Sequence, residues 1–194
     1  NDEQLIKLAQ QIKTWGKELG FQEIAITDTH LDEAEENLVT WLEQGRQGDM
    51  DWMSKHGSKR TRPAELVSGT QRIIIGRMDY WPPDILEEEA VLEDSNKAYN
   101  SRYALGRDYH KVLRQRLQKL STRIEDAIGS FGYRVFVDSA PVMEKPLAAK
   151  AGLGWVGKHS NLLNKDAGSW FFLGEIYTDI PLPIDKPVEN HCGT

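Results

Sequence analysis

Residues 137–164 read VDSAPVMEKPLAAKAGLGWVGKHSNLLN. The stretch begins at the end of a predicted apolar strand, YRVFV at 133–137, and runs directly into an acid, Asp138. A proline-flanked helical turn follows, then glycines at 152, 154 and 157. Active sites of layered α/β folds gather at strand ends. We therefore take the region after Asp138 as the candidate site and work outward from it.

Helical and extended patterns alternate along the rest of the chain. Apolar residues recur at spacings of three and four in the predicted helices, which span 5–19, 31–45 and 108–129, with a short helix near 50–55. The predicted strands are 23–27, 73–75, 133–137, 158–164 and 169–178. The last two strands are joined by the turn-like NKDAG, so they are expected to be antiparallel. The sequence predicts an α+β layered domain over 1–180, with a mixed, largely antiparallel sheet flanked by helices.

Composition excludes several classes of protein. The 194 residues carry a net charge of −6, which does not suit a non-specific nucleic-acid binder, because such proteins depend on basic surfaces. No apolar run approaches the length of a membrane span, and the polar first residues do not form a signal peptide. Cys192 is the one cysteine, which fits a reducing compartment, and we expect a cytoplasmic protein without membrane contact.

The three glycines match the spacing of a dinucleotide-binding fingerprint but not its context. That fingerprint follows a strand and opens a helix, whereas here a helical turn precedes the glycines and a predicted strand follows. Two interpretations stay open. The glycines let the backbone approach something flat or bulky, or they cap a helix and form a tight turn.

Asp138 also has two interpretations. Asp or Ser at a strand-to-helix junction is a good N-cap, and Ser139 is adjacent. Alternatively, Asp138 is a proton donor, a role that a carboxylic acid can fill near neutral pH only if burial raises its pKa.

The remaining reactive residues form no familiar catalytic or metal motif. The five histidines have no metal-ligand spacing, and there is no G-x-S-x-G sequence. Cys192, followed by Gly193 and Thr194, fits the start of a C-x2-C cluster motif that stops one residue before its second cysteine.

Several segments together resemble the epoxyqueuosine reductase family, and they occur in the family's order. They are KRTRP at 59–63, SRYALGRDYHKVLR at 101–114, the block at 137–163, GSWFFLGEI at 168–176 and the terminal HCGT. The resemblance covers the N-terminal portion of that family. It implies reduction of epoxyqueuosine to queuosine at the wobble position of tRNA, the last step of queuosine synthesis, with cobalamin and two [4Fe-4S] clusters. It also implies a fold like the corrinoid domains of reductive dehalogenases.

The resemblance implies a role for individual residues. Asp138 matches the catalytic aspartate that donates a proton to the epoxide oxygen, and Cys192 would be the first cluster ligand. The glycine-rich loop would lie against the corrin. Tyr109 and His110 would be either neighbours of the site or packing residues at a helix start. The residues that would contact the cobalamin, in addition to Asp138, are Arg60, Ser101, Lys158, His159, Ser160, Asn161, Leu162 and Leu173.

The resemblance also implies partners that the chain alone does not supply. Residues 181–194 would lead into a ferredoxin-like [4Fe-4S] domain, electrons would come from a donor protein or reductant, and the C-terminal part would bind most of the tRNA. Arg107, Lys111 and Arg114 fit a solvated helix face better than a phosphate-binding one. The alternatives are a corrinoid-binding or trafficking module without chemistry of its own and, more remotely, a flavin reductase.

Overall fold

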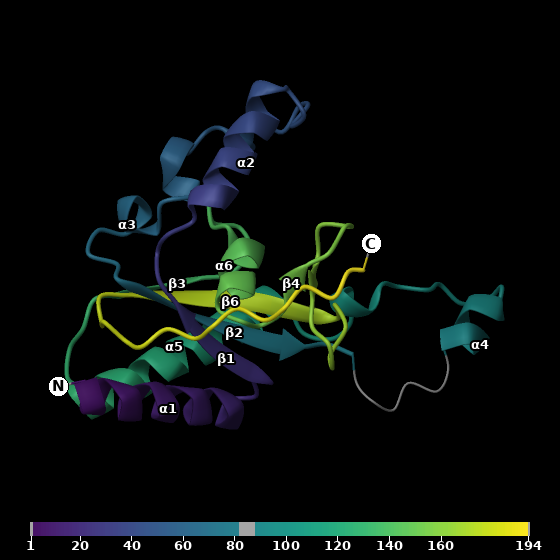
Figure 1. The fold of residues 1–194 in the computed structure, drawn as a ribbon. Helices are drawn as coiled ribbons and strands as arrows, with labels where there is room; N and C mark the ends of the chain where they lie inside the picture. Colours follow the sequence, from purple (N-terminus) through teal and green to yellow (C-terminus); the bar gives the residue numbers. More distant parts are fainter. Residues whose placement is uncertain (1, 82–87, 194) are drawn as a thin grey trace.

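A four-stranded sheet lies at the centre of the chain, in a computed structural model that describes residues 2–81 and 88–193 (Figure 1). Its order is β1-β2-β6-β3, and each neighbouring pair is antiparallel. The strands are β1 Glu23–Thr27, β2 Arg72–Asp79, β3 Tyr133–Phe136 and β6 Phe171–Thr178. The predicted α+β layered fold is confirmed. Among the described strands the sheet has no parallel pair, so it is more regular than the mixed sheet we expected.

Helices cover both faces of this sheet (Figure 1). On one face lie α1 (Asp2–Glu18) and α5 (Tyr109–Ile128), which share a hydrophobic cluster with the sheet. On the other face lies α6 (Glu144–Lys150), which belongs to a second cluster. Adjacent side chains of a strand point to opposite faces, so Ile74 joins the first cluster while Ile73 and Ile75 join the second. This is why the apolar run in β2 is continuous and does not alternate.

Helix α5 follows the predicted pattern along most of its length. Asp108 caps its N-terminus, because its carboxylate accepts the backbone N–H of His110. As predicted, the inward side chains of Leu113, Leu117, Leu120 and Ile124 are fully buried, and that of Val112 is partly buried. Ile128, by contrast, is 46% exposed. The prediction for Ile128 was wrong because α5 ends at that residue, beyond the part that packs on the sheet.

The predicted strand over 158–164 is corrected by the structure. Only β5 (Leu162–Leu163) is extended, and it pairs with β4 (Trp155–Val156) in a separate two-stranded sheet. Residues 157–161 form the loop of this hairpin, in which Gly157 N–H donates to the carbonyl of Asn161. The NKDAG turn closes with an isolated bridge between Asn164 and Gly168, after which β6 enters the central sheet instead of pairing with β5.

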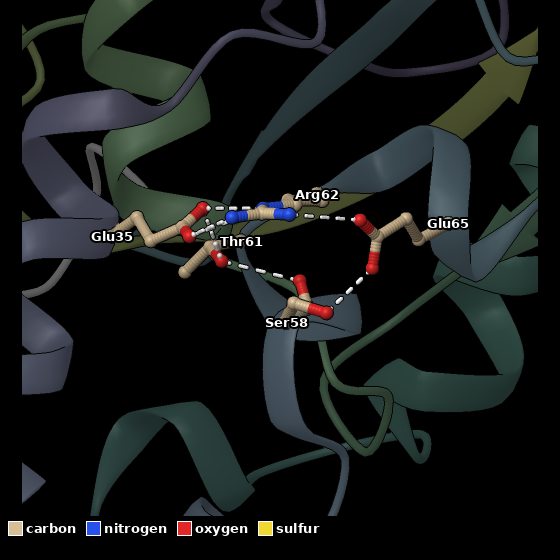
Figure 2. Close-up of polar contacts among 5 residues, drawn as sticks. All are labelled: Glu35, Ser58, Thr61, Arg62 and Glu65. Carbon is tan, nitrogen blue, oxygen red and sulfur yellow. Dashed lines mark hydrogen bonds and ion pairs between the residues drawn. The ribbon is translucent and has the colours of Figure 1, made fainter.

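Helix α2 (Asp32–Glu43) stands away from the sheet (Figure 1), and none of its residues is buried. An ionic network ties it to the segment after it. Figure 2 shows Arg62 between two carboxylates, with Glu35 of α2 on one side and Glu65 on the other. Ser58 donates to Glu65, and Thr61 donates to Glu35 at 2.9 Å. Side-chain contacts therefore hold α2 here, in place of a buried apolar face.

Short elements complete the chain. They are the 3-10 turns η1 Asp51–Met53, η2 Gly57–Arg60 and η3 Arg102–Ala104, with the helices α3 Pro63–Leu66 and α4 Glu88–Glu93. The acidic stretch at 84–94 is helical over α4, and its first part lies outside the described residues. In the described part of the chain, no helix is long and apolar enough to cross a membrane.

The segment after β6 runs along the domain without regular secondary structure. Leu182 is fully buried, and its carbonyl accepts from the Nε of Arg72 at 2.7 Å. The Asp185 backbone and carboxylate both bond to the main chain of Ile26, and the carboxylate also pairs with Lys13. Residues 182–185 are thereby anchored beside β1.

Candidate functional site

Asp138 lies just after β3 with a left-handed backbone, φ 54°. It and Ser160, φ 65°, are the non-glycine residues with positive φ among those that the structure describes. Such conformations are strained in residues that carry a Cβ, and they persist where the surroundings hold them, often at functional sites. A hydrogen bond holds the backbone of Asp138, because its N–H donates to Oε1 of Glu144 at 2.9 Å.

The side chain of Asp138 is 55% exposed and its Oδ2 has two partners from the start of α5. The hydroxyl of Tyr109 donates to it at 2.8 Å, and Nε2 of His110 lies 2.7 Å away. Tyr109 and His110 are thus neighbours of Asp138. The capping interpretation of Asp138 is wrong, because α6 begins only at Glu144 and its N-cap position, Met143, has no side-chain cap.

Both ring nitrogens of His110 face carboxylates. Its Nδ1 lies 3.0 Å from Oδ1 of Asp108, opposite the contact of Nε2 with Asp138. An imidazole can donate from both nitrogens only when it is protonated. The hydrogen bond to Asp138, reinforced by Asp108, raises the pKa of His110 above its ordinary value.

The same hydrogen bond from His110 lowers the pKa of Asp138, and the hydroxyl of Tyr109 lowers it further. This is opposite to the burial-driven increase that we expected for a carboxylic acid proton donor. Because Asp138 is largely exposed and accepts hydrogen bonds from His110 and Tyr109, these bonds lower its pKa more than desolvation raises it. These opposite shifts favour a proton on His110 over one on Asp138. Burial and the same carboxylate raise the pKa of Tyr109, which keeps its hydroxyl as a donor.

Two more carboxyl groups lie beneath Asp138. Burial raises the pKa of Glu144 to about 7. Glu175 of β6 is fully buried, and neither of its carboxylate oxygens has a hydrogen-bond partner among the described residues. Burial raises its pKa well above the ordinary value, and the nearby charges of Glu144 and Asp138 add to the effect. Tyr177, on the same strand and face, also has an unpartnered buried hydroxyl. Burial without a hydrogen-bond partner thus favours the neutral form of the Glu175 carboxyl group, which lies behind the site.

The hairpin residues that the resemblance assigns to cofactor contact lie mostly on an exposed loop. Lys158, His159, Ser160 and Asn161 are exposed, whereas Leu162 is buried in β5. Lys145 holds this loop, because its Nζ donates to the Ser160 carbonyl at 2.9 Å. It also donates to Oδ1 of Asn161 at 3.0 Å.

Three hollows adjoin the hairpin. Asn161, Leu162 and Leu173 line a pocket of about 210 Å³. Phe172 lines the same pocket and stacks on Tyr109 with 3.9 Å between ring centroids, which links the pocket to the Asp138 group. Ser160 lines a hollow of about 1070 Å³ whose walls are α2, α6, β4 and the 187–190 segment. Lys158 and Cys192 line a third hollow of about 430 Å³.

The glycines serve contacts within the chain. A Cβ on Gly152 would lie 2.3 Å from the carbonyl oxygen of Lys186, and one on Gly154 would lie 2.0 Å from that of Leu163. Both distances are far below van der Waals contact, and both glycines have positive φ. The tight-turn interpretation therefore accounts for these two glycines without an external ligand.

The other assigned residues lie in separate segments. Ser101 precedes η3, and Arg60 ends η2, where its Nη2 donates to the Trp52 carbonyl at 3.2 Å. The Nε of Arg60 is buried without a partner among the described residues, and burial lowers the pKa of its guanidinium. Neither residue takes part in the described hydrogen bonds of Asp138.

Cys192 is a free thiol at the surface of the domain. Nε1 of Trp155 donates to its Sγ at 3.2 Å, and its own N–H donates to Asn190. Within residues 2–81 and 88–193, no group of three or more His, Cys, Asp or Glu side chains could hold a metal ion.

Sequence reasoning missed Asp108, Glu144, Lys145 and Glu175. A signal was present for two of them. Asp108 is the first residue of the predicted helix at 108–129, and Asp at a helix start is typical of an N-cap. Glu175 is a lone acid inside the apolar strand FFLGEIYT, and such residues are seldom buried without a reason. For Glu144 and Lys145 the sequence held no comparable signal.

Comparison with known proteins identifies the family. The family model "Epoxyqueuosine reductase QueG, DUF1730" matches residues 60–139. The epoxyqueuosine reductase of Aliivibrio fischeri is 59% identical over 187 residues, which are 96% of this chain and 50% of that protein. That of Escherichia coli is 56% identical over 189 residues, again 50% of its length.

Solved structures of epoxyqueuosine reductases share the fold of this chain. The epoxyqueuosine reductase of Streptococcus thermophilus superposes with a TM-score of 0.82 at 26% identity, over 97% of this chain and 50% of that one. An epoxyqueuosine reductase bound to an epoxyqueuosine-modified tRNA stem loop has a TM-score of 0.80 at 23% identity, over 97% and 49%. A reductive dehalogenase studied for B12-dependent dehalogenation shares the fold more distantly, with a TM-score of 0.54 at 16% identity, over 95% and 21%. The chain belongs to the epoxyqueuosine reductase family, and it spans about half the length of the curated relatives it matches.

Proposed function

We propose that residues 1–180 form the cobalamin-binding catalytic part of an epoxyqueuosine reductase, which converts epoxyqueuosine in tRNA to queuosine. The observation that carries the proposal is the Asp138–His110 pair. It presents a proton at an exposed strand end, beside the hairpin whose residues the family resemblance assigns to the cofactor.

The reaction explains why a proton store is needed. Removing the epoxide oxygen forms a carbon–carbon double bond and water, and it consumes two electrons and two protons. Protonation of the oxygen as a C–O bond breaks avoids a charged alkoxide leaving group. His110 holds the proton between two carboxylates, and the exposed Asp138 carboxylate connects it to the substrate oxygen. Tyr109 donates to the same carboxylate oxygen and fixes its direction.

A hollow that adjoins the β4–β5 hairpin suits a large corrinoid. The hollow of about 1070 Å³ has mostly apolar walls, including Trp41, Met143 and Trp155, with Ser160 at its edge. Lys158, His159, Asn161, Leu162 and Leu173 would contact the cofactor on the hairpin side, and Arg60 and Ser101 from their own segments. When bound, the reduced cobalt would supply the electrons for the deoxygenation. Cys192 would ligate an iron–sulfur cluster together with residues outside this chain, in line with a domain that continues from 181–194.

Two partners follow from the proposal. The substrate is a tRNA that carries epoxyqueuosine, with the modified nucleotide splayed out of the anticodon loop to reach Asp138. The electrons come from a donor protein or a low-potential reductant through the clusters of the complete protein.

The test is an anaerobic reaction of the complete protein with cob(II)alamin, a low-potential reductant and an epoxyqueuosine-containing tRNA stem loop. Saturable cobalamin binding is followed by visible absorption, and queuosine is measured by nucleoside mass spectrometry. We expect queuosine only when cobalamin is present. Cobalamin binding without queuosine formation would instead support a corrinoid carrier, and a released flavin chromophore would contradict both.

A further inference from the structure

Two consecutive residues at the start of α6 hold the two strained backbone positions of the site. Glu144 accepts the N–H of Asp138 at 2.9 Å, and Lys145 donates to the carbonyl of Ser160 at 2.9 Å. Asp138 and Ser160 are also the non-glycine residues with positive φ in the described chain. Each unusual conformation is therefore matched by a charged side chain from the same helical turn.

The helix that carries these residues is rigidly placed. Leu147 and Ala148 of α6 are fully buried, and they belong to the cluster that α6 forms with Ile73, Ile75 and Tyr177 of the sheet. Side chains at the start of α6 are consequently positioned relative to β2 and β6, and not relative to the loops that they contact. A fixed element that holds two loops sets the position of one loop relative to the other.

Packing and hydrogen bonds restrict the side-chain conformations of Glu144 and Lys145. Both side chains are half-buried. The carboxyl group of Glu144 accepts the Asp138 N–H and lies close enough to the buried Glu175 to raise its pKa. Lys145 has a second bond, to the side chain of Asn161, so it holds two consecutive residues of the hairpin loop.

We infer that Glu144 and Lys145 are positioning residues that act as a paired clamp: Glu144 holds the loop of the proton-donating Asp138, and Lys145 holds the cofactor-facing loop 157–161. The roles of these two loops rest on the proposed function, whereas the clamp itself rests on the hydrogen bonds. The clamp keeps the proton store and the cofactor surface in one fixed arrangement, which a reaction that joins proton and electron delivery requires.

The clamp predicts a crossed pattern of amide exchange in the complete protein. Glu144→Ala removes the acceptor, so the Asp138 amide should exchange about tenfold faster, with loop 157–161 unchanged. Lys145→Met should produce the converse, with faster exchange in loop 157–161 alone. Glu144→Gln keeps an oxygen acceptor and should restore slow exchange at Asp138. Lys119→Met, an exposed substitution on α5, is the matched control and should change neither loop.

Measurements of kcat and of cobalamin affinity distinguish the role of Glu144 from that of Lys145. Glu144→Ala should lower kcat about tenfold or more while cobalamin affinity stays within about twofold, and Lys145→Met should weaken cobalamin binding about tenfold. Uniform exchange changes in both loops, or equal effects of Glu144→Ala and Glu144→Gln, would overturn the clamp. If the wild-type protein neither binds cobalamin nor forms queuosine, the proposed function fails, and the exchange experiment still decides on the clamp.

Discussion

Oδ2 of Asp138 and Nε2 of His110 lie 2.7 Å apart, although the residues are 28 positions apart in the sequence. The contact couples their titrations, lowering the pKa of the carboxyl group and raising that of the imidazole. The two opposite shifts favour a proton on the histidine over one on the aspartate, next to an exposed carboxylate that can pass it on.

Removal of the Asp138 charge should reduce the proton affinity of His110. Asp138→Asn suits the test, because asparagine tolerates the left-handed backbone that Asp138 adopts. We expect about a tenfold lower proton affinity, since the opposite charge that stabilises the imidazolium is lost. NMR titration of the His110 ring proton measures this, with His56 as an internal reference. An unchanged His110 titration would contradict the stored-proton interpretation.

The same Asp138→Asn variant should lose activity without losing cofactor. We expect queuosine formation to fall by roughly a hundredfold or more, because proton transfer to the leaving oxygen is impaired. Cobalamin affinity should stay near that of the wild type. Wild-type turnover should also decline as pH rises through the raised pKa of His110, since the stored proton is then lost. Full activity of the variant would rule out Asp138 as the route of the proton.

Glu144 should make the folding stability depend on pH. Burial raises the pKa of Glu144 to about 7, from an ordinary value of 4.5. Between these two pH values the carboxyl group is protonated in the folded protein and ionised in the unfolded chain. The free energy of unfolding should therefore fall between about pH 4.5 and pH 7, by on the order of 2 kcal/mol.

The variant Glu144→Gln should not lose stability over this pH range. The difference in free energy of unfolding between the variant and the wild type should therefore favour the variant more at pH 8 than at pH 5. Chemical denaturation at both pH values measures the difference. The charged groups that act on Glu144 are Asp138, Lys145 and His110. The charge of Glu144 in turn acts on the buried Glu175. Glu125→Gln, at an exposed position of α5, is the control. An identical pH dependence in Glu144→Gln and wild type would contradict the raised pKa.

Gly152 should be far less tolerant of alanine than Gly69, although their φ angles are 88° and 84°. Both angles lie in the range that disfavours a Cβ, so both substitutions carry backbone strain. Around Gly69 nothing lies within 4 Å of an added Cβ, whereas at Gly152 the Lys186 oxygen lies at 2.3 Å. We expect Gly152→Ala to destabilise the fold by about 2 kcal/mol more than Gly69→Ala. Thermal unfolding of the two variants checks this, and equal melting temperatures would show that the 186–187 segment moves away freely.

Local patterns in the sequence were enough to place the main elements. The three- and four-residue spacing of apolar side chains predicted α5, and the isoleucines at 73–75 predicted the first half of β2. Both signals come from residues that are close in the chain. The resemblance of residues 137–163 and 101–114 to one family also indicated the region of the site, and the comparisons confirm that family.

Only the tertiary structure decided how these elements meet. Contacts between distant segments decide the partner of β5 and the burial of Glu175 without a hydrogen-bond partner. They also decide that Glu144 and Lys145 hold two loops. The direction of the Asp138 pKa depends on them as well, because a pKa reports which charges and donors surround a group in space. The sequence by itself determined which residues are available and where the main helices and the strands of the central sheet lie. Packing determined which of those residues touch, and therefore where the proton is held.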